Sequence, residues 1–359
     1  VLLSALSLSA CGNSSSDTPN SGGSSSGGSA NDGSAPTWHQ DIAPLVAERC
    51  TGCHQDGGIS PFSLQTYAQA KMWSAAFDAV LRSGSMPPFL ARDTDDCKPR
   101  FGYKDDLRLS AEQIELFKRW NDAGCPEGDA ATAAALPEPP ELELKDAEVS
   151  ASIAGPVTIQ GPGDKFLCFS LAPDLTPLLA TGPEAALLGE RVLIDGIQVT
   201  PGNKQIVHHV LVFADPDGES ATLAGDKGYY DCFGGAKLTN PSLIMAWAPG
   251  ATPVVAPEGV AMAIPSKWRR GMQGHEHPTA ANQTDEGTSL QLRGYGAGIP
   301  TYVAASTLIG NARNQKADGM GLQPGPDDAA KPAFLIPAGA DAHSESMLFK
   351  VPATDWKSR

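Results

Sequence analysis

The chain has 359 residues, with 41 acidic and 26 basic side chains and a formal net charge of -15 at pH 7. Nucleic acid and anionic lipid carry charge of the same sign, so the composition excludes both as electrostatic partners. With 41% hydrophobic residues, 38 glycines and 30 prolines, the length and composition predict two or three folded units that are rich in turns and β-structure.

The chain begins VLLSALSLSACG, an apolar run that ends in small residues before Cys11. Residues 1–11 resemble a bacterial lipoprotein signal, in which the cysteine is lipidated. A transmembrane helix is the weaker alternative, because a span needs about 20 apolar residues. Gly12 at the next position favours outer-membrane sorting, so we expect a lipid anchor in a bacterial cell envelope, periplasmic or surface facing. Residues 12–36, rich in serine and glycine, are expected to form a flexible tether.

Residues 37–129 are expected to form a small helical unit. Three segments carry helical periodicity and termination signals: WHQDIAPLVAERC at 38–50, TYAQAKMWSAAFDAVLRSG at 66–84 and LSAEQIELFKRWNDAGC at 109–125. The last of these begins with a Ser, Glu and Gln pattern at 110–113 that is typical of a helix cap.

Within this unit, the segment ERCTGCHQDGG contains Cys50, Cys53 and His54. This CxxCH spacing is typical of haem c attachment, in which the thiols bond the vinyl groups and the histidine binds iron. A chance match or a zinc site is the alternative, but no further Cys/His pair lies close enough in sequence to complete a zinc site.

The sixth iron ligand is expected to be Met86 in SGSMPPFL, because the two prolines that follow restrict this loop. Met72 competes with it, although its helical spacing with aromatic neighbours favours a place in the core. His39 is a further alternative, although a lone histidine before a helix is more often a surface or capping residue. The unit resembles a class I c-type cytochrome over its whole length, which implies electron transfer to or from a redox protein or small reductant.

Four cysteines remain outside the signal and the CxxCH motif: Cys97, Cys125, Cys168 and Cys232. In an oxidising compartment they can form two disulfides, and pairing within each domain gives Cys97 to Cys125 and Cys168 to Cys232. Four buried free thiols are the alternative.

Residues 130–150 read as an Ala and Pro/Glu-rich linker, and the pattern then changes to short strands between turns. The expected strands are KFLCFSL at 165–171, ERVLIDGIQVT at 190–200, QIVHHVLVFA at 205–214, SLIMAWA at 242–248, TSLQLR at 288–293 and TYVAAS at 301–306. Alternating apolar runs at this spacing predict an antiparallel sandwich.

One expected strand contains His208 and His209 side by side among apolar residues. Neighbouring residues of a strand point to opposite faces, so both imidazoles can turn to one ion only if one residue lies at a strand end or bulge. A chance pair is the alternative.

The segments QIVHHVLVF, SLIMAWAPGATPVVAPEGVAMAIP and MQGHEHPT, with Cys232 between the first two, resemble the N-terminal half of the copper type II, ascorbate-dependent monooxygenases. This is the family of peptidylglycine α-hydroxylating and dopamine β-monooxygenases, and the likeness spans approximately residues 155–355. It implies an electron-storing copper on His208, His209 and a third histidine. The resemblance implies His275 as the third ligand, with His277 as a near substitute. The choice stays open because PSKWRRGMQGHEH carries basic residues where the family has an apolar strand, so the register of this segment is not fixed by the sequence.

The family also holds a second copper, on a His-x-His pair and a later Met, where O2 and an organic substrate react. In this chain His343 has no histidine partner and Met347 lacks the family's context. We therefore expect the sequence as given to lack that site and to hydroxylate no substrate.

The resulting expectation is a multidomain chain. A small all-α class I cytochrome c domain at 37–129 precedes the linker and an all-β, jelly-roll-like sandwich at 151–297, and residues 298–359 begin an incomplete second sandwich. Haem c and copper are the expected cofactors of an electron relay. A haem-bearing, copper-binding surface protein whose β-region is a scaffold, and a fragment of a complete monooxygenase, are the alternatives.

Overall fold

The computed structural model describes residues 34–89, 103, 106–137, 143–180, 188–267, 269–296, 298–304, 320–325, 334–340 and 343–348. The expected lipid site at Cys11, residues 12–33 of the tether and Cys97 lie outside these residues. Within them, no helix has both the length and the apolar character that crossing a membrane requires.

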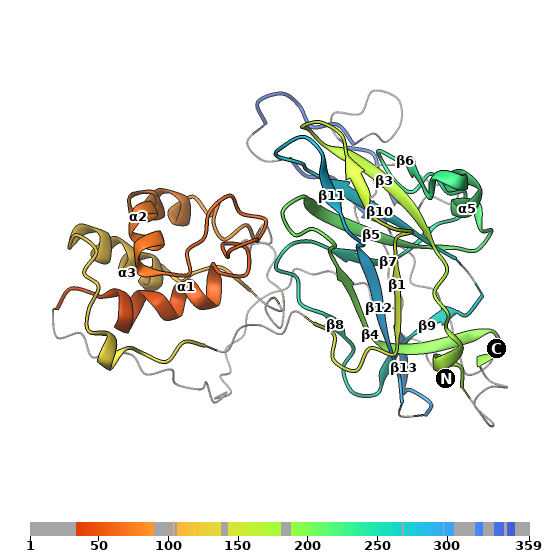
Figure 1. Ribbon diagram of the computed structural model, residues 1–359, viewed down its shortest axis with the longest axis horizontal. Helices are drawn as coiled ribbons and strands as arrows, with labels where there is room; N and C mark the ends of the chain where they lie inside the picture. Colours follow the sequence, from red (N-terminus) through yellow and green to blue (C-terminus); the bar gives the residue numbers. More distant parts are fainter. Residues whose placement is uncertain are drawn as a thin grey trace. The chain divides into compact units, whose positions relative to one another are not determined.

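The chain divides into two compact units, Val1–Pro140 and Glu141–Arg359. The division falls inside the stretch expected to be a linker, residues 130–150. Most of the regular structure is β-sheet and helices are few, as the turn-rich composition predicts (Figure 1).

The first unit contains the helices expected from the sequence, which are η1 (Trp38–Ile42), α1 (Ala43–Arg49), α2 (Tyr67–Arg82) and α3 (Ala111–Asp122). A short helix, η2 (Ala130–Thr132), lies in the stretch expected to be a linker. A capping box begins α2 at Thr66 and α3 at Ser110, where each hydroxyl accepts from the backbone three residues on. The expected cap at Ser110 is confirmed.

The core of the first unit is aromatic. Phe77 of α2 and Phe117 of α3 meet edge to face with ring centroids 5.2 Å apart, and Trp38 lies 6.1 Å from Trp120. Both tryptophans are almost fully buried. This packing brings α2, α3 and η1 together, and each of these helices buries one apolar face in the core.

The second unit contains two main sheets. The first has the order β1 (Val149–Ser152), β12 (Ser289–Gly294), β4 (Arg191–Thr200), β9 (Val260–Pro265) and β13 (Tyr302–Ala304), with β8 (Val254–Val255) also on β4. The second has the order β6 (Tyr229–Asp231), β3 (Lys165–Leu171), β10 (Arg269–Glu276), β5 (Val207–Asp215) and β7 (Ser242–Trp247). All six strands expected from the sequence are present.

The two sheets share one buried core, which makes this region a β-sandwich (Figure 1). Ile194 and Leu292 from the first sheet join Val210 and Met272 from the second, each at most 1% exposed. The smaller elements are β2 (Val157–Ile159) with β11 (Gln283–Asp285), β14 (Gly321–Leu322) with β15 (Met347–Leu348), α5 (Glu219–Ala224), η3 (Thr176–Leu178) and η4 (Gly225–Lys227).

The strand β10 was not predicted, although it lies at the centre of the second sheet between β3 and β5. It begins with Arg269 and Arg270, and these charged residues do not fit the apolar pattern by which a buried strand is recognised in a sequence. Arg270 is fully buried, and its guanidinium donates to the carbonyls of Arg269 at 3.1 Å and Pro265 at 2.9 Å. Burial lowers the pKa of Arg270 to about 10.

Part of the stretch expected to start a second sandwich belongs to the first sheet. Tyr302, Val303 and Ala304 of β13 pair in parallel with β9. Residues 302–304 are therefore part of the first sheet of the sandwich.

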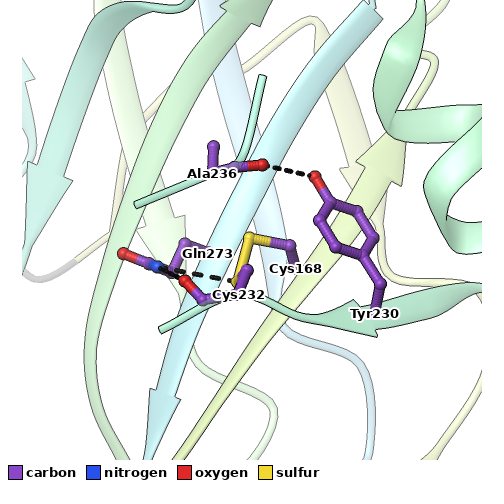
Figure 2. The surroundings of a disulfide bond; sticks show 5 residues. All are labelled: Cys168, Tyr230, Cys232, Ala236 and Gln273. Atoms are coloured by element: carbon purple, nitrogen blue, oxygen red, sulfur yellow. Dashed lines mark hydrogen bonds between the residues drawn. A yellow bond between two sulfur atoms is a disulfide. The ribbon is translucent and has the colours of Figure 1, made fainter. Parts of the chain in front are cut away.

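The expected disulfide between Cys168 and Cys232 is confirmed, with Cα atoms 5.8 Å apart (Figure 2). It joins β3 to the segment after β6. Gln273 of β10 donates to the Cys232 carbonyl at 2.7 Å, and the Tyr230 hydroxyl donates to the Ala236 carbonyl at 2.8 Å. Cys125 is a buried free thiol, so the structure does not bear out its expected pairing with Cys97.

Candidate metal centre

A β-bulge turns two consecutive histidines toward one point. On the paired strands β5 and β10, His209 lies opposite His275, whereas Val207 lies opposite Glu276. His208 is therefore the extra residue of a bulge, which removes the strict alternation of faces. The prediction that one member of the histidine pair lies at a bulge is confirmed.

The nitrogen atoms of three imidazoles converge at this bulge. His209 Nδ1 lies 3.3 Å from His208 Nδ1 and 3.2 Å from His275 Nδ1. The candidate ligand atoms of the three residues all lie within 4.8 Å of one another. His208 is exposed, His209 half-buried and His275 buried, so the cluster can hold a metal ion that is open to solvent on one side.

The environment lowers the pKa of two of these imidazoles, His208 and His209. Burial, and then the neighbouring His275 and His277, hold the pKa of His208 below its ordinary value. Burial, followed by His275 and His208, lowers the pKa of His209 in the same way. A neutral imidazole has a free lone pair, so a metal ion can bind here without first displacing a proton.

The structure distinguishes the two candidates for the third ligand. His275 belongs to the cluster, whereas the ring of His277 lies 6.4 Å from that of His208. The backbone N–H of His277 donates to Ile206 at 2.7 Å, and its Nδ1 lies 2.6 Å from Asp164 Oδ1. His275 is therefore the third candidate ligand and His277 lies beside the site.

An aromatic side chain forms one wall of the cluster. Phe166 of β3 stacks on His275 with ring centroids 4.3 Å apart and an angle of 7° between the planes. Phe233 meets Phe166 edge to face at 4.9 Å, and it directly follows the disulfide residue Cys232. Sequence reasoning missed both phenylalanines, because only the register of β3 on β10 brings Phe166 opposite His275.

The CxxCH motif lies where α1 ends. Cys50 follows the last residue of α1, and the His54 backbone N–H donates to the Cys50 carbonyl at 2.9 Å. Both Cys50 and Cys53 are present as thiols. Burial, then Cys53, raises the pKa of Cys50 to about 12 against a smaller opposing effect of Arg49.

One nitrogen of His54 is occupied by its own loop. Its Nδ1 lies 2.7 Å from Ser60 Oγ and 3.3 Å from the Phe62 carbonyl. The Phe62 ring lies 4.6 Å from the imidazole and stacks on Trp73 at 4.1 Å. These contacts fix the ring and assign Nε2 as the nitrogen for a metal ligand bond.

Met86 and Met72 are both exposed, although Met72 was expected to lie in the core. Met86 is 42% exposed and lines a cavity of about 320 Å³ together with Phe89 and Arg108. The prediction that Met72 belongs to the core is wrong, because it is 76% exposed; α2 buries Phe77 and Leu81 on its other face. His39 lies in η1, with Nε2 3.7 Å from Glu127 Oε1.

The residues considered for a second copper form a different arrangement. His343 Nε2 lies 2.7 Å from Glu345 Oε1, and Met347 begins β15. Among the residues that the structure describes, His343 belongs to no group of three metal-ligating side chains.

No protein-family model matches the chain, and no curated protein matches it.

Proposed function

We propose that this chain is an electron relay that moves single electrons between haem c in the helical unit and copper on His208, His209 and His275. The observation that carries the proposal is the convergence of three Nδ1 atoms at the bulge of β5. Bound copper supplies reversible one-electron storage, and imidazole ligands suit it.

The donor set fits copper better than it fits most other ions. Calcium and magnesium prefer oxygen ligands, whereas the cluster offers three imidazole nitrogens. Zinc also accepts three imidazoles, so the metal must be identified by measurement. The exposed side of the cluster, at His208, leaves a position through which a small reductant or a redox protein can reach the ion.

The contacts around the CxxCH motif support haem c. Cys50 and Cys53 are thiols rather than a disulfide, as attachment to the vinyl groups requires. His54 has its Nδ1 held by Ser60 and Phe62, which leaves Nε2 for iron. Met86 is accessible at the lining of a cavity and is the proposed sixth ligand, in place of Met72 or His39. Bound haem supplies a second one-electron centre.

From these two candidate sites we propose a protein class for each unit. The helical unit is proposed to be a class I c-type cytochrome. The sandwich is proposed to be jelly-roll-like and related to the N-terminal half of the copper type II monooxygenases. Covalent connection of the two units raises the effective concentration of one redox centre at the other. A lipid on Cys11 is the proposed attachment to the outer membrane.

Catalysis is not part of the proposal. In the family that the sandwich resembles, hydroxylation takes place at a second copper, and among the described residues His343 pairs with Glu345. The proposal is therefore limited to storage and transfer of electrons.

Metal content tests the proposal. The protein is matured in a bacterial periplasm, and copper and zinc are counted by elemental analysis against haem absorbance. We expect one copper per haem, lost when both His208→Ala and His209→Ala are introduced and kept in the control His343→Ala, which removes a histidine outside the cluster. Zinc in place of copper, or no metal at all, contradicts the relay and leaves the sandwich as a scaffold.

A further inference from the structure

One carboxylate beside the cluster contacts two imidazoles. Asp164 directly precedes β3, and its Oδ1 lies 3.1 Å from His275 Nε2 and 2.6 Å from His277 Nδ1. The two histidines come from the end of β10 and the residue just after it. Asp164 therefore joins the start of β3 to the end of the neighbouring strand at the metal centre.

The carboxylate lies beside a buried ring nitrogen of His275. His275 Nδ1 lies 3.2 Å from His209 Nδ1, whereas Nε2, the other ring nitrogen, lies 3.1 Å from Asp164 Oδ1 in a contact that is not aligned as a hydrogen bond, and no other partner in the described residues serves this buried nitrogen. A carboxylate oxygen only accepts hydrogen bonds, so it favours the tautomer in which Nε2 carries the proton. The same tautomer leaves a lone pair on Nδ1, directed at the cluster.

His275 is thereby held on two sides. Phe166 stacks against the ring face at 4.3 Å, which limits tilting of the ring plane. Asp164 meets the ring edge, which opposes rotation about the bond to Cβ. Only 11% of the His275 side chain is exposed, so the orientation of this ring is set by protein contacts rather than by water.

His277 has a place in the same arrangement. Its backbone N–H is fixed to the Ile206 carbonyl at 2.7 Å, and its Nδ1 is the second partner of the Asp164 carboxylate. Because 52% of the Asp164 side chain is exposed, a second partner restricts a carboxylate that would otherwise turn into solvent.

We propose that Asp164 is a positioning residue that holds His275 in the Nε2-protonated tautomer, so that Nδ1 is presented to the metal, and that His277 anchors Asp164 instead of binding the ion. The proposal rests on the three-histidine metal site of the proposed function. Hydrogen-bonded partners of metal-binding histidines commonly contribute about 10- to 100-fold in metal affinity.

The tautomer can be measured without any copper. The full chain is prepared with its haem reduced and copper removed by a chelator, and ¹⁵N NMR reports which His275 nitrogen is protonated. We expect protonated Nε2 and unprotonated Nδ1 in the unsubstituted protein, and a mixture of tautomers in Asp164→Ala. Asp164→Asn keeps an accepting oxygen without the charge, so it should keep the tautomer.

Copper affinity is the second readout, measured by competition with a chromogenic chelator. Asp164→Ala should weaken copper binding about 10- to 100-fold, and Asp164→Asn should weaken it less. The control Asp226→Ala removes an exposed carboxylate elsewhere in the same unit and should leave affinity unchanged. An unchanged tautomer in Asp164→Ala overturns the inference.

The two proposals fail in different ways. If the unsubstituted chain binds no copper but Asp164→Ala scrambles the His275 tautomer, the positioning role stands and the relay fails. If copper binds at one per haem and Asp164→Ala changes neither the tautomer nor the affinity, the relay stands and the positioning role is wrong.

Discussion

Phe166 lies almost parallel to His275, with ring centroids 4.3 Å apart and 7° between the planes. The two residues face each other across β3 and β10. Because a flat aromatic wall fixes the plane of an imidazole, this pair links the packing of the sheet to the geometry of the candidate metal centre.

Replacing Phe166 should therefore affect both stability and metal binding. Phe166→Ala removes the stack on His275 and the contact with Phe233, and we expect a loss of about 1 to 2 kcal/mol in the free energy of unfolding with weaker copper binding. Phe166→Leu keeps apolar volume without the flat ring, so it should recover stability more than affinity. Urea unfolding measures the free energy of unfolding, and chelator competition measures the copper affinity. If Phe166→Leu restores stability and affinity to the same extent, the flat ring does not matter for metal binding.

The disulfide between Cys168 and Cys232 should stabilise the sandwich unit. The bond closes a sequence separation of 64 residues, and loss of such a cross-link typically costs about 2 to 5 kcal/mol. We expect dithiothreitol to lower the unfolding temperature of the sandwich in the unsubstituted chain but not in the double variant Cys168→Ala, Cys232→Ala. If dithiothreitol lowers the unfolding temperature of both proteins equally, its effect does not come from the Cys168–Cys232 disulfide and the prediction is wrong.

Stability of the sandwich should depend on pH through Glu276. This side chain is 1% exposed, and burial, with a smaller contribution from Asp285, raises its pKa from 4.5 to about 8. A raised pKa of an acid means that the folded state binds the proton more tightly than the unfolded state does. The stabilisation is therefore complete below about pH 4.5 and is lost as pH rises toward 8.

Substitution isolates this contribution. Glu276→Gln removes the ionisable group, so with copper removed the free energy of unfolding should fall less between pH 5 and 8 than in the unsubstituted chain, by about 2 to 4 kcal/mol. The exposed Glu190→Gln serves as control and should keep the full pH dependence. Parallel pH profiles for Glu276→Gln and the unsubstituted chain would contradict a buried, protonated Glu276.

The haem potential should respond to Met86 and not to Met72. A thioether on the iron raises the reduction potential relative to weaker or water ligation, so Met86→Ala should lower the midpoint in a redox titration. Met72→Ala removes a more exposed methionine from the same unit and should leave the midpoint unchanged. A shift produced by Met72→Ala alone would reverse the assignment of the sixth ligand.

Local patterns predicted a large part of the fold. Alternation identified β3, β4 and β5, and the cap residues located the start of α3. The strand β10 escaped prediction because Arg269 and Arg270 occupy its first positions. Arg270 can be buried because the carbonyls of Arg269 and Pro265 accept its N–H groups, and the pattern of apolar and polar residues does not report these hydrogen bonds.

The candidate site was predictable only in part, for a related reason. His208 and His209 are adjacent, so the sequence alone raised the idea of a bulge. The choice of His275 over His277 depends on the register of β10 against β5. Asp164 stands 113 positions before His277, and its role appears only when β3 and β10 pair.

Electron exchange between the two centres tests the relay most directly. The haem is reduced by a light flash in protein that carries Cu(II), and haem absorbance is followed together with the Cu(II) electron paramagnetic resonance signal. The relay predicts that haem reoxidation and loss of Cu(II) occur in one-to-one proportion, at a rate independent of protein concentration, and that both disappear with His208→Ala and His209→Ala. A haem that stays reduced beside unchanged Cu(II), or a rate that rises with protein concentration, would contradict it.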